Sequence, residues 1–165
     1  MSRTNKQLLM WVLYALLALA VCLLQTVVLS NVRFRLFPVH LMPALVVACA
    51  MFTGHELGGL FGLIMGFVWS SAGSGDGALS ILTFTVCAVL AGWLCDAVFP
   101  RTLPVYLILS AGALLLHQMA VFLLSVYLSS AAVPWSHLPL DLFLSVCGGL
   151  PLFAASAAIR KAGGD

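Results

Sequence analysis

Apolar runs long enough to cross a membrane recur along this chain and limit its fold more than any other feature. The clearest runs cover residues 8–29, 78–99, 105–128 and 139–158. A helix needs about 20 apolar residues to cross the hydrocarbon core of a bilayer. Only 7% of the 165 residues are charged, whereas a soluble domain carries roughly 25%. The sequence therefore predicts an all-α membrane protein whose surface mostly faces lipid.

The first apolar run begins like a secretory signal, because Arg3 and Lys6 precede it. It is, however, longer than the roughly 7–15 apolar residues of a signal peptide. We therefore expect a retained first transmembrane helix over residues 8–29.

The stretch from residue 38 to residue 72 allows two interpretations. One helix over residues 41–71 would be about 46 Å long, which exceeds the roughly 30 Å hydrocarbon core. The sequence Gly54-His55-Glu56 also interrupts the apolar run. We expect two short helices over residues 38–53 and 57–72 that meet at His55-Glu56. The alternative is a re-entrant pair, and the glycine-rich stretch 73–77 predicts a turn after it.

These segments together predict a single domain, residues 1–165, with six transmembrane helices. Their expected ranges are 8–29, 38–53, 57–72, 78–99, 105–128 and 139–158. Six crossings place five basic residues on one side and two on the other: Arg3, Lys6, Arg101, Arg160 and Lys161 against Arg33 and Arg35. Basic residues in short loops favour the cytoplasm, so both termini are expected there. A re-entrant pair leaves this count unchanged.

Small residues follow one face of the third expected helix. They recur at spacings of three and four residues: Gly59, Gly62, Gly66, Ser70 and Gly73. Such a face lets another helix backbone approach closely. The fourth expected helix has its own ladder of small residues: Ser80, Thr83, Cys87, Ala91 and Cys95. We expect these two helices to pack together, and a docking face for a partner's helix is the alternative.

A few polar side chains lie inside the apolar runs. Gln25 is near the end of the first run, and His117 and Gln118 are near the centre of the fifth helix. A polar group in lipid must find a partner. Interhelical hydrogen bonds and a binding role are equal alternatives for these residues. At a helix end, Asp96 is expected to pair with Arg101.

Signals for catalysis, metals and nucleic acids are weak. The chain has no HExxH motif and no phosphate-binding loop before a helix. Its five cysteines form no CxxC pair, and no ligand spacing joins them to the histidines. The basic residues do not form a patch of the kind that binds nucleic acid. We therefore expect a non-enzymatic protein without cofactor, metal or nucleic-acid partner.

Several segments in order resemble the bacterial rod shape-determining protein MreD family. Leu24-Gln25-Thr26 ends the first helix, and residues 54–66 read GHELGGLFGLIMG. Residues 73–78 read GSGDGA, and Ala91-Gly92-Trp93-Leu94 follows in the next helix. The resemblance covers most of the chain and is best over residues 24–94. The family often has Asp where this chain has Val39-His40 and Trp69.

The resemblance implies a six-helix fold similar to the S component of energy-coupling-factor transporters. It also implies a non-enzymatic membrane subunit of the cell-wall elongation complex in the bacterial inner membrane. MreC would be the direct partner, with RodA, a class B penicillin-binding protein and MreB in the wider complex. The alternative function is an S component that binds a vitamin or metal and delivers it to an ATP-driven module.

Overall fold

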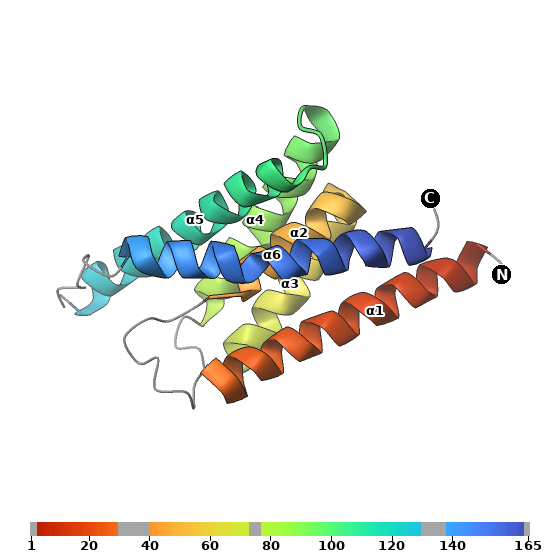
Figure 1. The fold of residues 1–165 in the computed structure, drawn as a ribbon. Coiled ribbons are helices and arrows are strands. Elements are labelled where there is room, and N and C mark those ends of the chain that lie inside the picture. Colours follow the sequence, from red (N-terminus) through yellow and green to blue (C-terminus); the bar gives the residue numbers. More distant parts are fainter. Residues whose placement is uncertain (1–2, 30–39, 73–76, 130–137, 164–165) are drawn as a thin grey trace.

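A computed structural model of the chain describes residues 3–29, 40–72, 77–129 and 138–163 (Figure 1). Every regular element among these residues is helical. In chain order the elements are α1 (Arg3–Leu23), the π-helical turn η1 (Leu24–Leu29), α2 (Met42–Thr53), α3 (His55–Ser71), α4 (Ala78–Ala97), α5 (Leu103–Ser129) and α6 (Leu138–Gly163). The helices form one bundle, and the ends of the chain lie at the same end of it.

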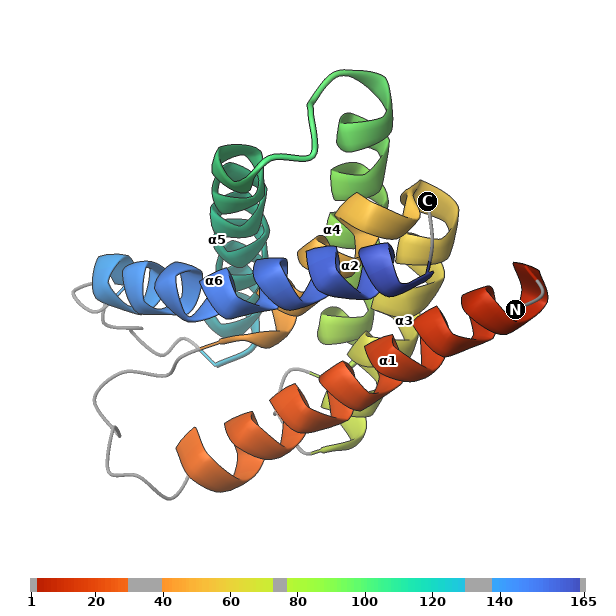
Figure 2. The same cartoon turned by 45° about the vertical axis from the view of Figure 1, so that its right-hand side comes forward.

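The short helix α2 is the centre of this bundle. Every residue from Leu41 to Met51 is buried, and Met42 and Leu45 are completely enclosed. Helices α3, α4, α5 and α6 contact α2, and α1 touches it more lightly (Figure 2). A helix that is apolar on all sides is expected to be enclosed in this way.

Local backbone chemistry sets the ends of α2. Pro43 lies in its first turn, where proline removes an N–H group that would lack an intrahelical partner. The helix ends at Gly54, whose φ of 88° is favourable only for glycine. The break thus lies at Gly54, and His55-Glu56 begins α3 instead of separating the helices. The start at Met42 is four residues later than the expected residue 38.

Helix α3 runs antiparallel to α4 at very short range. A Cβ atom built on Gly66 would lie 2.5 Å from Ile81 Cα, and one built on Gly62 would lie 2.7 Å from the Phe84 carbonyl oxygen. At the other end, a Cβ atom on Gly92 would lie 2.6 Å from His55 Cα. Only glycine allows two backbones to approach this closely, so these residues fix the α3–α4 pair.

One carboxylate links three segments where α4 ends. Asp96 Oδ1 accepts a hydrogen bond from Arg101 Nη2 at 2.8 Å, and Asp96 Oδ2 lies 3.2 Å from His55 Nδ1. The expected pairing of Asp96 with Arg101 is confirmed. Because His55 begins α3, this carboxylate also joins the α2–α3 junction to the connection between α4 and α5.

Among the residues that the structure describes, four segments are long and apolar enough to cross a membrane: Asn5–Val27, Ala78–Ala97, Leu103–Leu124 and Leu142–Lys161. The 12 residues of α2 and the 17 residues of α3 correspond to about 18 and 26 Å of helix. Helix α6 continues through Pro151. The structure therefore defines an all-helical bundle with four candidate spans around a shorter central helix.

Candidate functional site

Polar side chains from five segments gather around the start of α2. Gln25 comes from η1, His40 precedes α2, Thr83 comes from α4, His117 from α5 and Ser145 from α6. We call these five residues the polar ring. All except His40 are buried, and His40 is half-buried. The first turn of α2 thus lies inside the bundle, next to polar groups that form hydrogen bonds with the backbone or with one another.

Two members of the polar ring accept hydrogen bonds from the chain as it enters α2. Gln25 Oε1 accepts the backbone N–H of Leu41 at 3.3 Å, and Ser145 Oγ accepts the backbone N–H of His40 at 2.9 Å. The first N–H groups of a helix have no intrahelical acceptor. A helix start buried in an apolar bundle therefore needs acceptors from neighbouring helices.

His117 joins α5 to α4 within the same ring. Its Nδ1 lies 2.9 Å from Thr83 Oγ1, and Thr83 Oγ1 is also 2.9 Å from the Leu79 carbonyl oxygen. Thr83 Oγ1 is thus within hydrogen-bond distance of both the His117 ring and the backbone of α4, and it links the two helices. The His117 ring also packs against Phe84 and His40, at centroid distances of 5.2 and 6.3 Å.

Tyr106 of α5 contacts both α2 and α6, about one helical turn beyond the start of α2. Its hydroxyl lies 2.9 Å from the Gly149 carbonyl oxygen and 3.3 Å from that of Ala44, and it donates its proton to these two acceptors. A Cβ atom on Gly149 would lie 2.7 Å from the Tyr106 hydroxyl oxygen. The glycine in α6 therefore makes room for the tyrosine.

The residues singled out from the sequence have different surroundings in the structure. Gln25 and His117 belong to the polar ring, whereas Gln118, the neighbour of His117, is half-buried. On α3, Gly59, Gly62 and Gly66 face α4, and Ser70 is half-buried. Gly73 lies outside the described residues. The chain's own α4 thus occupies the face formed by the three glycines.

The ladder of small residues on α4 points elsewhere than expected. Thr83 contacts His117 of α5, and the Cys87 thiol lies 3.8 Å from the Ala113 carbonyl oxygen of α5. The α3 glycines instead meet Ile81, Phe84 and Ala88. The expectation that these two helices pack together is confirmed. Thr83 and Cys87 of the ladder nevertheless face α5, because neighbouring residues in a helix point about 100° apart.

Three residues that make these contacts were not recognisable as site residues in the sequence: His40, Tyr106 and Ser145. His40 was placed inside the expected helix over residues 38–53, and single Tyr and Ser residues are common in apolar helices. A weak signal was present, because Tyr106, Ser110 and His117 recur at spacings that share one face of α5. In the structure these three residues are buried on the side of α5 that faces the bundle.

The chemistry that this arrangement supports is cohesion between helices. Apart from the Thr83–Leu79 bond within α4, each hydrogen bond of this site joins two helices or caps a helix start. Within the described residues no group of three or more His, Cys, Asp or Glu side chains is placed to hold a metal ion. All five cysteines are free thiols.

Comparison of the chain with family models, curated proteins and solved structures finds no match. The class of the protein therefore follows from its own architecture. It is an all-helical, membrane-embedded protein that is built around a buried central helix.

Proposed function

We propose that this protein is a non-enzymatic, multi-pass subunit of the bacterial cell-wall elongation complex and resembles MreD. In this role it positions peptidoglycan synthesis along the side wall through helix-to-helix contacts. MreC is its proposed direct partner, with RodA, a class B penicillin-binding protein and MreB in the wider complex. The proposed location is the bacterial cytoplasmic membrane.

The central observation behind this proposal is the use of buried polar groups for cohesion. The Gln25 and Ser145 side chains cap the start of α2, and the Tyr106 hydroxyl links α5 to α2 and α6. A bundle held in this way is a rigid support that presents outer helix faces to lipid and to other membrane proteins. The motifs of residues 24–94 resemble those of MreD and follow one another in the same order. This resemblance is the reason for proposing the cell-wall elongation complex.

Depletion of the protein in its rod-shaped host tests this function. We expect the cells to become round within a few generations, and the tagged protein to co-purify with MreC. Re-expression of the wild-type chain should restore rods, which controls for effects on neighbouring genes. Rods that persist after depletion, together with the absence of MreC from the purified protein, would contradict the proposal.

We further propose six crossings with both termini in the cytoplasm. Two observations support this topology over a re-entrant pair. The α2–α3 junction at Gly54 lies beside Asp96 in the last turn of α4, because a Cβ atom on Gly54 would lie 3.3 Å from Asp96 Oδ2. Close contacts at Gly92 of α4 and, further along the pair, at Gly62 and Gly66 of α3 keep α3 beside α4 along most of its length. A hairpin that extends to the end of α4 therefore supports two crossings by α2 and α3.

Thiol labelling in intact cells tests this topology. With the five native cysteines replaced, we expect Ser2→Cys and Gly163→Cys to resist an impermeant maleimide until the cells are opened. Ser74→Cys should react in intact cells, because the α3–α4 connection would then face outward. Labelling of both terminal positions before lysis would overturn the cytoplasmic placement. Protection of position 74 in intact cells would contradict the outward placement of the α3–α4 connection.

The polar ring favours a second candidate function, an S component that binds a small molecule for uptake. Gln25, His40, Thr83 and His117 bring donors and acceptors together at the start of a helix inside the bundle. Intramembrane polar residues are candidates for ligand contacts. A small molecule that stays bound through purification, and that Gln25→Leu releases, would rank this function above the first.

A further inference from the structure

Two hydroxyl groups lie next to each other where α1 packs against α6. Tyr14 of α1 and Ser156 of α6 are both completely enclosed. Although the two hydroxyls are neighbours, they are not in hydrogen-bond geometry, and neither has another hydrogen-bond partner within the described part of the chain. A polar group that is buried in a membrane bundle needs a partner. The two hydroxyls therefore indicate a small polar ligand that binds to both.

The Ser156 hydroxyl behaves differently from other hydroxyl groups on the helices of this protein. Thr53, Ser71 and Thr85 each donate to the carbonyl oxygen four residues earlier, at 2.8, 2.8 and 2.7 Å. Such a bond satisfies the hydroxyl within its own helix. Ser156 Oγ makes no bond of this kind, so its proton and its lone pairs are available to a group between α6 and α1.

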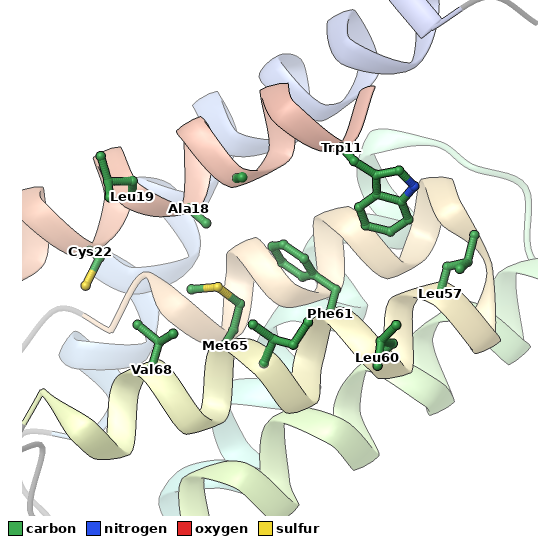
Figure 3. Close-up of a pocket in the computed structure, with 11 residues that line it drawn as sticks. Trp11, Ala18, Leu19, Cys22, Leu57, Leu60, Phe61, Met65 and Val68 are labelled. Carbon is green, nitrogen blue, oxygen red and sulfur yellow. The ribbon is translucent and has the colours of Figure 1, made fainter. Parts of the chain in front are cut away.

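Apolar contacts hold the ring of Tyr14 in place. The ring packs against Trp11 and Phe61 at centroid distances of 6.2 and 6.1 Å. Figure 3 shows these two side chains in the space between α1 and α3. Because the ring is fixed by its contacts with α3 and with its own helix, the Tyr14 hydroxyl stays beside Ser156.

Cys49 and Arg160 complete the polar surroundings of the two hydroxyls. The Cys49 thiol of α2 and the Arg160 guanidinium of α6 are both close enough to act electrostatically on Tyr14. Cys49 is completely enclosed, whereas Arg160 is half-buried and lies one turn beyond Ser156 towards the end of α6. Hydroxyl and thiol groups suit an uncharged ligand, and the positive charge of Arg160 opposes a cation.

We propose that one water molecule binds between Tyr14 Oη and Ser156 Oγ and joins α1 to α6. A buried water makes about three hydrogen bonds, and the Cys49 thiol is its third partner. Each hydroxyl group is both a donor and an acceptor, so a single water satisfies both without any charged group. The half-buried Arg160 marks the route by which this water enters from the end of α6.

This water completes the attachment of α1 to the bundle. The buried side chains of α1 and η1 share one helical face, at spacings of four, three and four residues: Tyr14, Ala18, Val21 and Gln25. Gln25 accepts the Leu41 backbone N–H at one end of this face, and Tyr14 binds the water at the other. Lipid provides no hydrophobic drive for helix association, so these two polar contacts fix the position of α1. This role is independent of the function proposed above.

X-ray radiolytic labelling of the wild-type protein in lipid nanodiscs tests this proposal. Ionisation of a bound water produces a hydroxyl radical beside the side chains that hold it. Tyr14 and Tyr106 are equally enclosed, but Tyr106 donates directly to two carbonyl oxygens and is therefore the matched control. We expect Tyr14 to be oxidised several times faster than Tyr106. The third tyrosine, Tyr127, is 91% exposed and serves as the positive control.

The same measurement distinguishes a bound water from a direct bond between the two hydroxyls. A direct bond would leave Tyr14 as well protected from oxidation as Tyr106. Equal oxidation rates for these two tyrosines, with Tyr127 oxidised, would therefore overturn the proposal.

Two serine variants locate the water. Ser156→Ala removes one of its partners and should lower the oxidation of Tyr14 to the rate of Tyr106. Ser110→Ala is the matched control, because Ser110 is also completely buried but its hydroxyl lies 3.1 Å from the Leu107 carbonyl oxygen of its own helix. Tyr14 should be oxidised at the wild-type rate in this control. Unchanged oxidation of Tyr14 in Ser156→Ala, or an equal decrease in both variants, would contradict a water held by Ser156.

Discussion

Gly66→Ala should destabilise the protein more than any other single methyl group added to the described glycines of α3. The new Cβ atom would lie 2.5 Å from Ile81 Cα and 3.0 Å from the Ser80 carbonyl oxygen. Both atoms belong to the α4 backbone, which cannot turn aside as a flexible side chain would. Overpacking of a tight core costs about 1–3 kcal/mol, and we expect a loss of about 3 kcal/mol.

Thermal unfolding in detergent measures this effect. For a chain of this length, about 3 kcal/mol corresponds to a decrease of about 6–12 °C in Tm. Gly112→Ala is the matched control, because its Cβ atom would meet no other atom within 4 Å. Its Tm should stay within about 2 °C of the wild-type value. Similar Tm values for the two variants would contradict a close α3–α4 contact.

Removal of both caps from α2 should have a comparably large effect. The variant Gln25→Leu/Ser145→Ala leaves the backbone N–H groups of Leu41 and His40 without the acceptors that they have in the wild-type protein. The buried Leu41 donor left unsatisfied costs about 1–3 kcal/mol, and the half-buried His40 donor costs less, so the expected total loss is about 2–4 kcal/mol. Chemical denaturation of the single and double variants measures the loss.

Two controls separate capping from the removal of a polar side chain. Ser145→Thr keeps the hydroxyl group and should retain most of the stability. Gln118→Leu removes the amide next to His117 from a half-buried position and should cost less than Gln25→Leu. If Gln118→Leu costs as much as Gln25→Leu, the special role of Gln25 at the start of α2 is excluded. Because these measurements are made without a ligand, they would also show whether the polar ring stabilises the folded protein by itself.

The sequence predicted the helical class because the length of an apolar run is a local property. Residues 78–99 and 105–128 were expected to be long helices, and α4 and α5 occupy these stretches as Ala78–Ala97 and Leu103–Ser129. The small-residue face of α3 was also visible, because glycines three and four residues apart share one side of a helix. The expected packing of α3 on α4 is confirmed, but the contacts of Thr83 and Cys87 with α5 were not visible in the sequence.

The polar ring shows the same division between local and tertiary information. Gln25 and His117 were recognisable from the sequence, because a polar side chain in an apolar run needs a partner. Their partners lie far away in the chain: Gln25 meets the backbone of Leu41, and His117 meets Thr83. His40 and Ser145 could be recognised as members of the polar ring only from the tertiary structure, which places α6 beside the start of α2.

The sequence alone determined that this chain forms apolar helices suited to a membrane, because hydropathy and glycine spacing act within a single helix. Only the tertiary structure decided that the shortest helix, α2, is the enclosed centre and that polar side chains from η1, α4, α5 and α6 gather at its start. The physical reason is that burial depends on which helices surround a segment. An apolar face looks the same in the sequence whether it meets lipid or another helix.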